Sequence, residues 1–287
     1  MAQSTFLIQN NLFITRRVVK LIFSIIVWGY DQIKRFFFRL FGKTVPGTCV
    51  VLYYHMVEQK ERQNFAWQLD GILRSAELIR ADTKNPLTPN THHVAVTFDD
   101  GFVDILANAV PELMKRNIPF TIFVPTGYLG KNPEWIKKKE YRLHRGPVMS
   151  EAQVRDIRKC VLVTIGSHCV SHTDLRLMDE NSAKKEIQSS KHELENIIGR
   201  KVNLLSFPHG AYSDKCIEFA RQAGYERVFT IKPALGLLSP NEFITGRISV
   251  SPGDWPFEFK LKVLGAYRWL SLAYSLKRQI LSVWNWG

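Results

Sequence analysis

The stretch "VAVTFDDGF", residues 94–102, decides how this chain is expected to fold. Residues 94–98 are apolar or β-branched, as in a strand that is covered on both faces, and two carboxylates follow at once. Because neighbouring side chains of a strand point to opposite faces, Asp99 and Asp100 cannot both be ordinary solvent-facing charges beside a covered strand. We therefore expect at least one of them to lie next to a group that requires a negative charge.

Similar apolar runs recur along the chain and alternate with amphipathic stretches of helical length. The expected strands are residues 49–55, 94–98, 120–124, 161–166, 202–207 and 227–231, and the expected helices are residues 104–116, a helix opened by Ser150, residues 179–198 and residues 214–223. Apolar strands that alternate with helices indicate a parallel sheet covered on both faces. The predicted fold is α/β, an irregular (β/α) barrel of about seven parallel strands with N- and C-terminal amphipathic helices. An open doubly wound sheet is the alternative.

Charge and composition divide the chain into three parts. Its 287 residues suffice for one large α/β domain, and its net charge is +13. Residues 1–45 hold seven basic side chains against a single acidic one, Asp31. We interpret residues 1–45 as a basic amphipathic leader, residues 46–255 as the barrel and residues 256–287 as a C-terminal amphipathic helix.

The leader has the composition of a helix that lies at a membrane surface. Its apolar run, residues 18–30, is interrupted by Lys20 and is shorter than the roughly 20 residues that span a bilayer. It has no small-residue cleavage site, which argues against a secretory signal. Arginines beside aromatic and branched aliphatic residues suit an interfacial helix or an uncleaved signal anchor, so the leader is a candidate membrane anchor. A helix that caps the core is the structural alternative. Trp269, Trp284 and Trp286 give the C-terminal stretch a similar character. The expected location is membrane-associated, in the cell envelope, and the cytoplasmic face of the membrane is the alternative.

Other classes of partner and chemistry fit the sequence less well. A cationic surface attracts nucleic acid as well as anionic lipid, but the barrel has no basic motif interleaved with stacking aromatics, and the leader is too apolar for a nucleic-acid arm. No nucleic acid partner is therefore expected. The cysteines show no CxxC or zinc-ribbon spacing, so we expect reduced, packed thiols at Cys49, Cys160, Cys169 and Cys216.

Histidines and carboxylates gather where the expected strands end. These positions are Tyr54-His55, Asp99-Asp100, Ser167-His168 and Pro208-His209, with His172 shortly after the third. Functional groups of parallel α/β folds collect at the carboxyl ends of the strands. The sequence therefore predicts a site at this rim of the barrel.

The chemistry of the rim suggests a metal centre. His168 and His172 are four residues apart, so their imidazoles can converge on one ion if the segment turns helically. With one carboxylate they form a two-histidine, one-carboxylate set, which is a ligand pattern of catalytic zinc and also of non-haem iron. A hydrolase of this type needs a second, uncoordinated carboxylate to accept a proton from water. This requirement explains a pair of aspartates.

These motifs resemble those of the polysaccharide deacetylases with a NodB-homology domain, which are metal-dependent carbohydrate esterases on an irregular (β/α) barrel. The matching stretches are "YYHMV" (53–57), "TFDDG" (97–101), "SHCVSHTDL" (167–175) and "SFPHG" (206–210). The resemblance implies that Asp99 is the general base and that Asp100, His168 and His172 hold one divalent ion, with zinc as the first candidate. It also implies that the backbone N–H of His209 stabilises the oxyanion.

Two positions depart from the family pattern. Many members carry an arginine that pairs with the catalytic aspartate, and this chain has Ser206 at that position; Arg247 is the candidate to supply the charge from another strand end. Many members also have a late general-acid histidine, but no histidine follows His209. The acid is then either His55, which we favour, or His209.

The predicted function is a metal-dependent hydrolase that removes N-acetyl groups from an N-acetylated glycan or a lipid-linked saccharide, with a membrane surface as a further partner through the leader. The alternative is a metal-retaining carbohydrate-binding protein with weak or no turnover, which the two departures would permit. An intact Asp99 argues against this alternative, because a binding protein has no use for a general base.

Overall fold

The structure is a computed structural model that describes residues 2–136 and 146–276, with side chains from residue 14 onward. The strands are β1 (Thr48–Tyr54), β2 (Glu77–Leu78), β3 (His92–Phe98), β4 (Phe120–Val124), β5 (Val163–Ser167), β6 (Leu204–Ser206), β7 (Arg227–Phe229), β8 (Ile244–Thr245) and β9 (Ile248–Ser249). The helices are α1 (Ala2–Leu40), α2 (Arg62–Ser75), α3 (Val110–Lys115), α5 (Glu151–Ile157), α6 (Glu180–Ile198), α7 (Asp214–Gln222) and α8 (Pro256–Val263).

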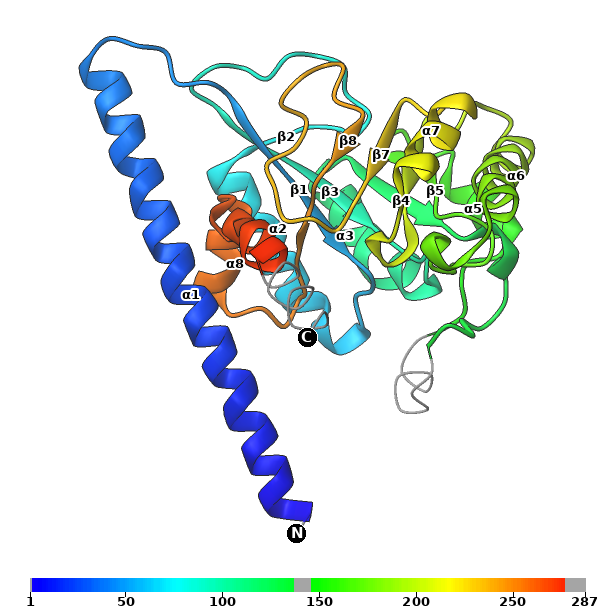
Figure 1. Cartoon of the computed structure of the whole chain (residues 1–287), viewed down its shortest axis with the longest axis horizontal. Coiled ribbons are helices and arrows are strands. Elements are labelled where there is room, and N and C mark those ends of the chain that lie inside the picture. Colours follow the sequence, from blue (N-terminus) through cyan, green and yellow to red (C-terminus); the bar gives the residue numbers. More distant parts are fainter. Residues whose placement is uncertain (1, 137–145, 277–287) are drawn as a thin grey trace, which may run out of the picture.

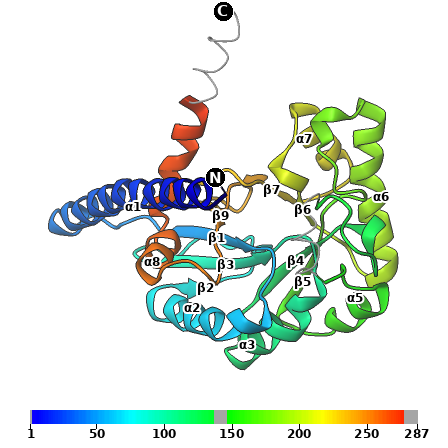
Figure 2. The ribbon, with the colours of Figure 1, turned by 90° about the horizontal axis from the view of Figure 1, so that it is seen from below.

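The strands form one parallel sheet that curls into the predicted irregular barrel. Its order is β8-β7-β6-β5-β4-β3-β1-β9, and β2 pairs with β3. β8 and β9 are two halves of one extended segment, interrupted at Gly246 and Arg247. The first half pairs with β7 and the second pairs with β1, so this segment joins the two ends of the sheet. Figure 2 shows the curled sheet with helices around its outside.

Local sequence signals account for several of the helices. Ser150 caps α5 with a capping box in which its hydroxyl accepts from the N–H of Gln153, as the sequence predicts. The helical stretch after β3, which lies in the expected range 104–116, buries Ile105, Ala109 and Leu113 on one face. Pro111 has no N–H to donate within this stretch, and a π-helical turn, Ile105–Ala109, precedes it.

Two elements differ in detail from the sequence patterns. β3 begins at His92, before the start of the expected strand, and His92 and His93 are buried, with ring nitrogens at the backbone carbonyls of Val263 and Thr48. The described part of the C-terminal stretch is helical in separate segments. α8 ends at Val263, and the left-handed Gly265 separates it from a short 3-10 turn (Ala266–Trp269) and a helical segment at 270–276. Trp284 and Trp286 lie outside the described residues.

α1 is a long helix that lies along the outside of the barrel, beside α8 (Figure 1). Its N-terminal half contacts the segment after β9, through Arg17 and Glu258, and its C-terminal half contacts the start of β1, through Arg35 and Thr48. α1 and β1 therefore run in opposite directions, and the carboxyl ends of the strands lie beside the N-terminal half of α1. Among the described residues, no helix combines the length and the apolar character that crossing a membrane requires.

Candidate metal centre

The two aspartates of the opening stretch lie just beyond the carboxyl end of β3. The N–H of Asp99 bonds to the carbonyl of Tyr54 at 2.9 Å, and Asp100 then takes a left-handed conformation with φ of 68°. A turn rather than a strand therefore sets the direction of the Asp100 side chain. Gly101 also has a positive φ, and a Cβ there would come 3.2 Å from Val124. This backbone explains why the pair is followed by glycine.

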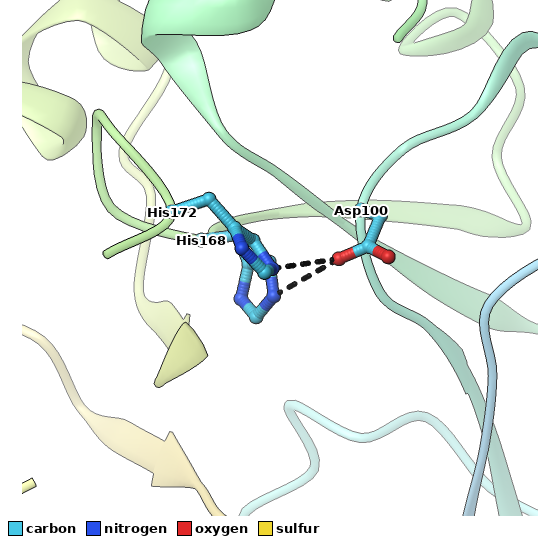
Figure 3. A group of neighbouring side chains, drawn as sticks. All are labelled: Asp100, His168 and His172. Carbon is cyan, nitrogen blue, oxygen red and sulfur yellow. Dashed lines mark ion pairs between the residues drawn. The ribbon is translucent and has the colours of Figure 1, made fainter. Parts of the chain in front are cut away.

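Asp100, His168 and His172 form one buried group (Figure 3). The Oδ1 atom of Asp100 lies 3.4 Å from Nε2 of His168 and 3.0 Å from Nε2 of His172. One ligand atom from each of the three residues can be chosen so that all lie within 4.8 Å of one another. The structure thus brings together the three residues that the sequence proposes as metal ligands.

The loop that carries the two histidines is not helical, so their rings converge by another route than a helical turn. Cys169 and His172 both have left-handed backbones, with φ of 59° and 54°. The Oε2 atom of Glu186, on α6, accepts hydrogen bonds from the N–H groups of Val170 and Ser171 at 2.9 and 2.8 Å. A carboxylate that binds two successive N–H groups holds this otherwise strained loop in place.

The imidazole rings are oriented by different contacts. The Nδ1 atom of His168 lies 2.7 Å from the carbonyl of Ser206, so Nδ1 carries the proton in the neutral ring and Nε2 presents its lone pair toward Asp100. The ring of His172 stacks on Trp135 at 4.1 Å between centroids, and its Nδ1 has no hydrogen-bond partner among the described residues. Two imidazole nitrogens and a carboxylate oxygen facing one point fit a divalent ion such as zinc or iron.

Asp99 is held by Arg247, which is fully buried. Nη1 of the guanidinium donates to Oδ1 and Nη2 donates to Oδ2, both at 2.7 Å, so the pair is bidentate. Nη2 also donates to the hydroxyl of Ser206 at 2.8 Å. Arg247, which lies between β8 and β9, therefore contacts both Asp99 and Ser206. Ser206 is the position at which the family pattern has an arginine.

The environment keeps both carboxylates ionised. Burial alone would raise the pKa of Asp99, but the charges of Arg247 and His168 outweigh it and hold this pKa below its usual value. For Asp100, burial is likewise outweighed by the hydrogen bonds that His168 and His172 donate when their rings are protonated, and its pKa lies well below the usual value. Burial lowers the pKa of His172, whereas for His168 the neighbouring carboxylates overcome burial and raise the pKa.

The two candidate acids lie at the rim of this group. His209 is exposed, has a left-handed backbone with φ of 56°, and places its ring 4.6 Å from that of His172. His55 is half-buried, with its ring 5.5 Å from that of Tyr53, and lies close enough to act electrostatically on Asp99 and Asp100. All the residues named as site candidates from the sequence therefore lie at one end of the barrel.

Sequence reasoning missed two residues of this site. Glu186 sits in the long charged helix α6, where it looks like any solvated carboxylate. Trp135 sits in a polar loop, 4.6 Å from Tyr128 and stacked on His172. Neither has a motif or a spacing that links it to the histidines, because each reaches them only through the folded chain.

The fold and the site define a class: a parallel (β/α) barrel with a buried two-histidine, one-carboxylate group and a separate arginine-bound aspartate at the carboxyl ends of its strands. Residues 87–228 match the family model described as polysaccharide deacetylase. Over these residues, just under half of the chain, the protein is similar to the polysaccharide deacetylase family.

Individual relatives agree with this assignment. The Bacillus subtilis protein YxkH, which carries the family's name, is 27% identical over 165 residues, covering 58% of this chain and 54% of the relative. The poly-β-1,6-N-acetyl-D-glucosamine N-deacetylase of Staphylococcus aureus is 25% identical over 179 residues, covering 59% of this chain and 57% of the relative. The chain thus spans little more than half the length of these curated relatives.

Solved structures share the fold. The structure of IcaB from Ammonifex degensii matches with a TM-score of 0.63 at 23% identity, over 78% of this chain and 98% of the other. The Streptococcus pyogenes deacetylase PplD matches with a TM-score of 0.59 at 19% identity, over 77% of this chain and 98% of the other. At these identities the likeness is one of fold.

Proposed function

We propose that this protein is a metal-dependent hydrolase that removes N-acetyl groups from an N-acetylated glycan. The observation that carries the proposal is the arginine-bound Asp99 beside the Asp100, His168 and His172 group, because it separates a metal-holding carboxylate from one that stays free to accept a proton. The name of the Staphylococcus aureus relative supports N-acetylglucosamine polymers as the first substrates to test.

Each residue has a defined task in this proposal. Asp100, His168 and His172 would hold the divalent ion, with zinc as the first candidate, and the bound ion would supply Lewis acidity toward water and the amide carbonyl. Asp99 accepts a proton from the attacking water, and Arg247 fixes the direction of its carboxylate. The backbone N–H of His209 donates to the carbonyl oxygen as negative charge develops there.

The departing amine needs a proton, and we assign this transfer to His55. His55 and His209 are both at the rim, but the left-handed backbone of His209 suits a residue selected for its N–H rather than for its side chain. His55→Asn is expected to reduce kcat about 10²- to 10⁴-fold and to remove the alkaline limb of the pH–rate profile. His209→Asn keeps the N–H and tolerates positive φ, so it should retain that limb. The reverse result would make His209 the acid.

The function is tested by acetate release from chitin oligomers, poly-N-acetylglucosamine, peptidoglycan and lipid-linked saccharides, with and without a chelator. Asp99→Asn should still bind zinc but lose most acetate release, whereas Asp100→Ala and His168→Ala should lose zinc itself. Asp156→Asn, an exposed carboxylate on α5, is the matched control and should change neither. Full activity of Asp99→Asn would contradict its role. Zinc binding without acetate release from any substrate would favour the carbohydrate-binding alternative.

The same proposal includes a setting in the cell envelope, where the substrate is either an exported glycan or a lipid-linked saccharide and the protein lies at a membrane surface. The support for this setting is the basic leader, now seen as α1. The faces of α1 allow the membrane contact to be specified further.

A further inference from the structure

α1 turns its polar face toward the barrel. The Nε atom of Arg17 lies 2.5 Å from Oε2 of Glu258, and Asp31 accepts two hydrogen bonds from Arg268 at 2.6 and 2.8 Å. Ser24 is fully buried and its hydroxyl accepts from the indole of Trp269 at 3.0 Å. The helix is thus attached by ion pairs and hydrogen bonds, together with aromatic contacts at Trp255 and Trp269 and the packing of Leu21 and Trp28 against the core.

The opposite face of α1 is apolar and exposed. We call it the outer strip: Val18, Val19, Ile22, Ile26, Tyr30, Ile33, Phe36, Phe37 and Leu40. Exposed fractions range from 39% at Val18 to 63% at Tyr30. At 3.6 residues per turn these positions share one side of the helix, and no charged residue falls among them over a length of about 33 Å. A helix that caps a core buries its apolar side, whereas α1 exposes the outer strip.

The apolar surface continues beyond the helix. Ile26 and Tyr30 form one wall of a groove of ≈ 630 Å³, and Leu238 and Leu272 lie on its other sides. Leu238 is 52% exposed and Leu272 is 69% exposed. Three segments that are distant in sequence therefore contribute to one exposed apolar surface, and a soluble monomer rarely keeps such a large patch without a partner.

Cations lie along the edges of the outer strip. Arg16, Lys34 and Arg39 are exposed, and the helical period places them beside the strip rather than on it. In this arrangement aliphatic stems can lie along an apolar phase while the charges reach anionic headgroups. A second copy of the chain is a poor partner by comparison, because it would bring together two surfaces of the same sign in a protein with a net charge of +13.

We propose that α1 docks the protein onto an anionic lipid bilayer, with the outer strip immersed at the boundary between headgroups and acyl chains. The helix lies in the plane of the membrane and keeps its polar face on the barrel. Because α1 and β1 run in opposite directions, the mouth of the barrel opens along the bilayer, at the end where Arg17 meets Glu258, and not into it (Figure 1). The proposal does not depend on the hydrolase activity.

The test is flotation of the full chain with vesicles of phosphatidylglycerol and phosphatidylethanolamine, compared with phosphatidylcholine alone. The triple variant Ile22→Ser/Ile26→Ser/Ile33→Ser should lower the partition coefficient by about 100-fold or more, because three half-exposed apolar side chains are removed from the contact. The matched control is Val161→Ser/Leu177→Ser. These residues are 86% and 82% exposed but do not belong to the strip, so the control should bind like the wild type.

A second variant tests the charge. Lys34→Gln/Arg39→Gln should weaken binding to the anionic vesicles and flatten its dependence on salt. All variants change exposed side chains, and unchanged thermal unfolding and zinc binding would show that they fold. Wild-type protein that does not float with anionic vesicles, or a triple variant that floats equally well, would overturn the proposal. A dimer that the triple variant dissociates, without any vesicle binding, would assign the strip to a second copy instead.

Discussion

Arg247→Met removes the guanidinium from Asp99 while keeping an unbranched side chain of similar reach. In the wild type the guanidinium makes two bonds of 2.7 Å to the carboxylate, and both groups are buried. Removing one partner of a buried ion pair leaves an unpaired charge and costs about 3–5 kcal/mol. Each charge-assisted bond is worth about 1.5–3 kcal/mol, so two such bonds give a cost of the same order.

The assay is urea unfolding followed by circular dichroism, in buffer with a chelator, so that metal binding does not contribute to the measured stability. The control is Arg155→Met, which breaks the exposed pair with Glu151 on α5 and should cost about 0.3–0.5 kcal/mol. The double variant Arg247→Met/Asp99→Asn should recover part of the loss, because it removes the buried carboxylate that the single variant leaves unpaired.

Two results would contradict this prediction: Arg247→Met costs no more than Arg155→Met, or the double variant is less stable than Arg247→Met alone. The first result would mean that the carboxylate of Asp99 does not depend on the guanidinium. The second would mean that Asp99 contributes to stability through some other contact.

Three further predictions concern other parts of the molecule. Hydrogen bonds from Arg62 and Arg116 hold the pKa of Glu112 below its usual value. The ionised Glu112 side chain therefore stabilises the folded state fully above pH of about 4.3, and this contribution is lost as pH falls through the depressed pKa. Glu112→Gln should therefore be about 1–2 kcal/mol less stable than the wild type at pH 7 in urea unfolding, and a gap that persists at low pH would contradict this. Of the four thiols, Cys160 is the half-buried one, so dithionitrobenzoate should label it first in the native protein; rapid labelling of a second thiol would argue against the packing. Zinc should raise the melting temperature of chelator-treated wild type but not of His168→Ala, and an equal rise in both would place the metal elsewhere.

Much of the fold could be read from the sequence because its signals are local. Apolar runs such as residues 94–98 mark buried parallel strands whatever else the chain does, and Ser150 marks a helix start through its own hydrogen bonds. The convergence of Asp100, His168 and His172 was also predictable, since the carboxyl ends of parallel strands meet at one rim. The backbone conformation of the loop that carries the two histidines was not predictable. It depends on left-handed residues and on Glu186, which the spacing of the histidines does not reveal.

Only the tertiary structure decided two further features. Arg247 reaches Asp99 across 148 residues because β8 and β9 join the two ends of the sheet, and no pattern in the sequence states how a barrel closes. The sequence likewise shows that α1 has a polar and an apolar face, but not which of them meets the barrel. The positions of Glu258 and Arg268 decide this, because charges that are wholly or partly removed from water require partners, and the helix turns Arg17 and Asp31 toward them.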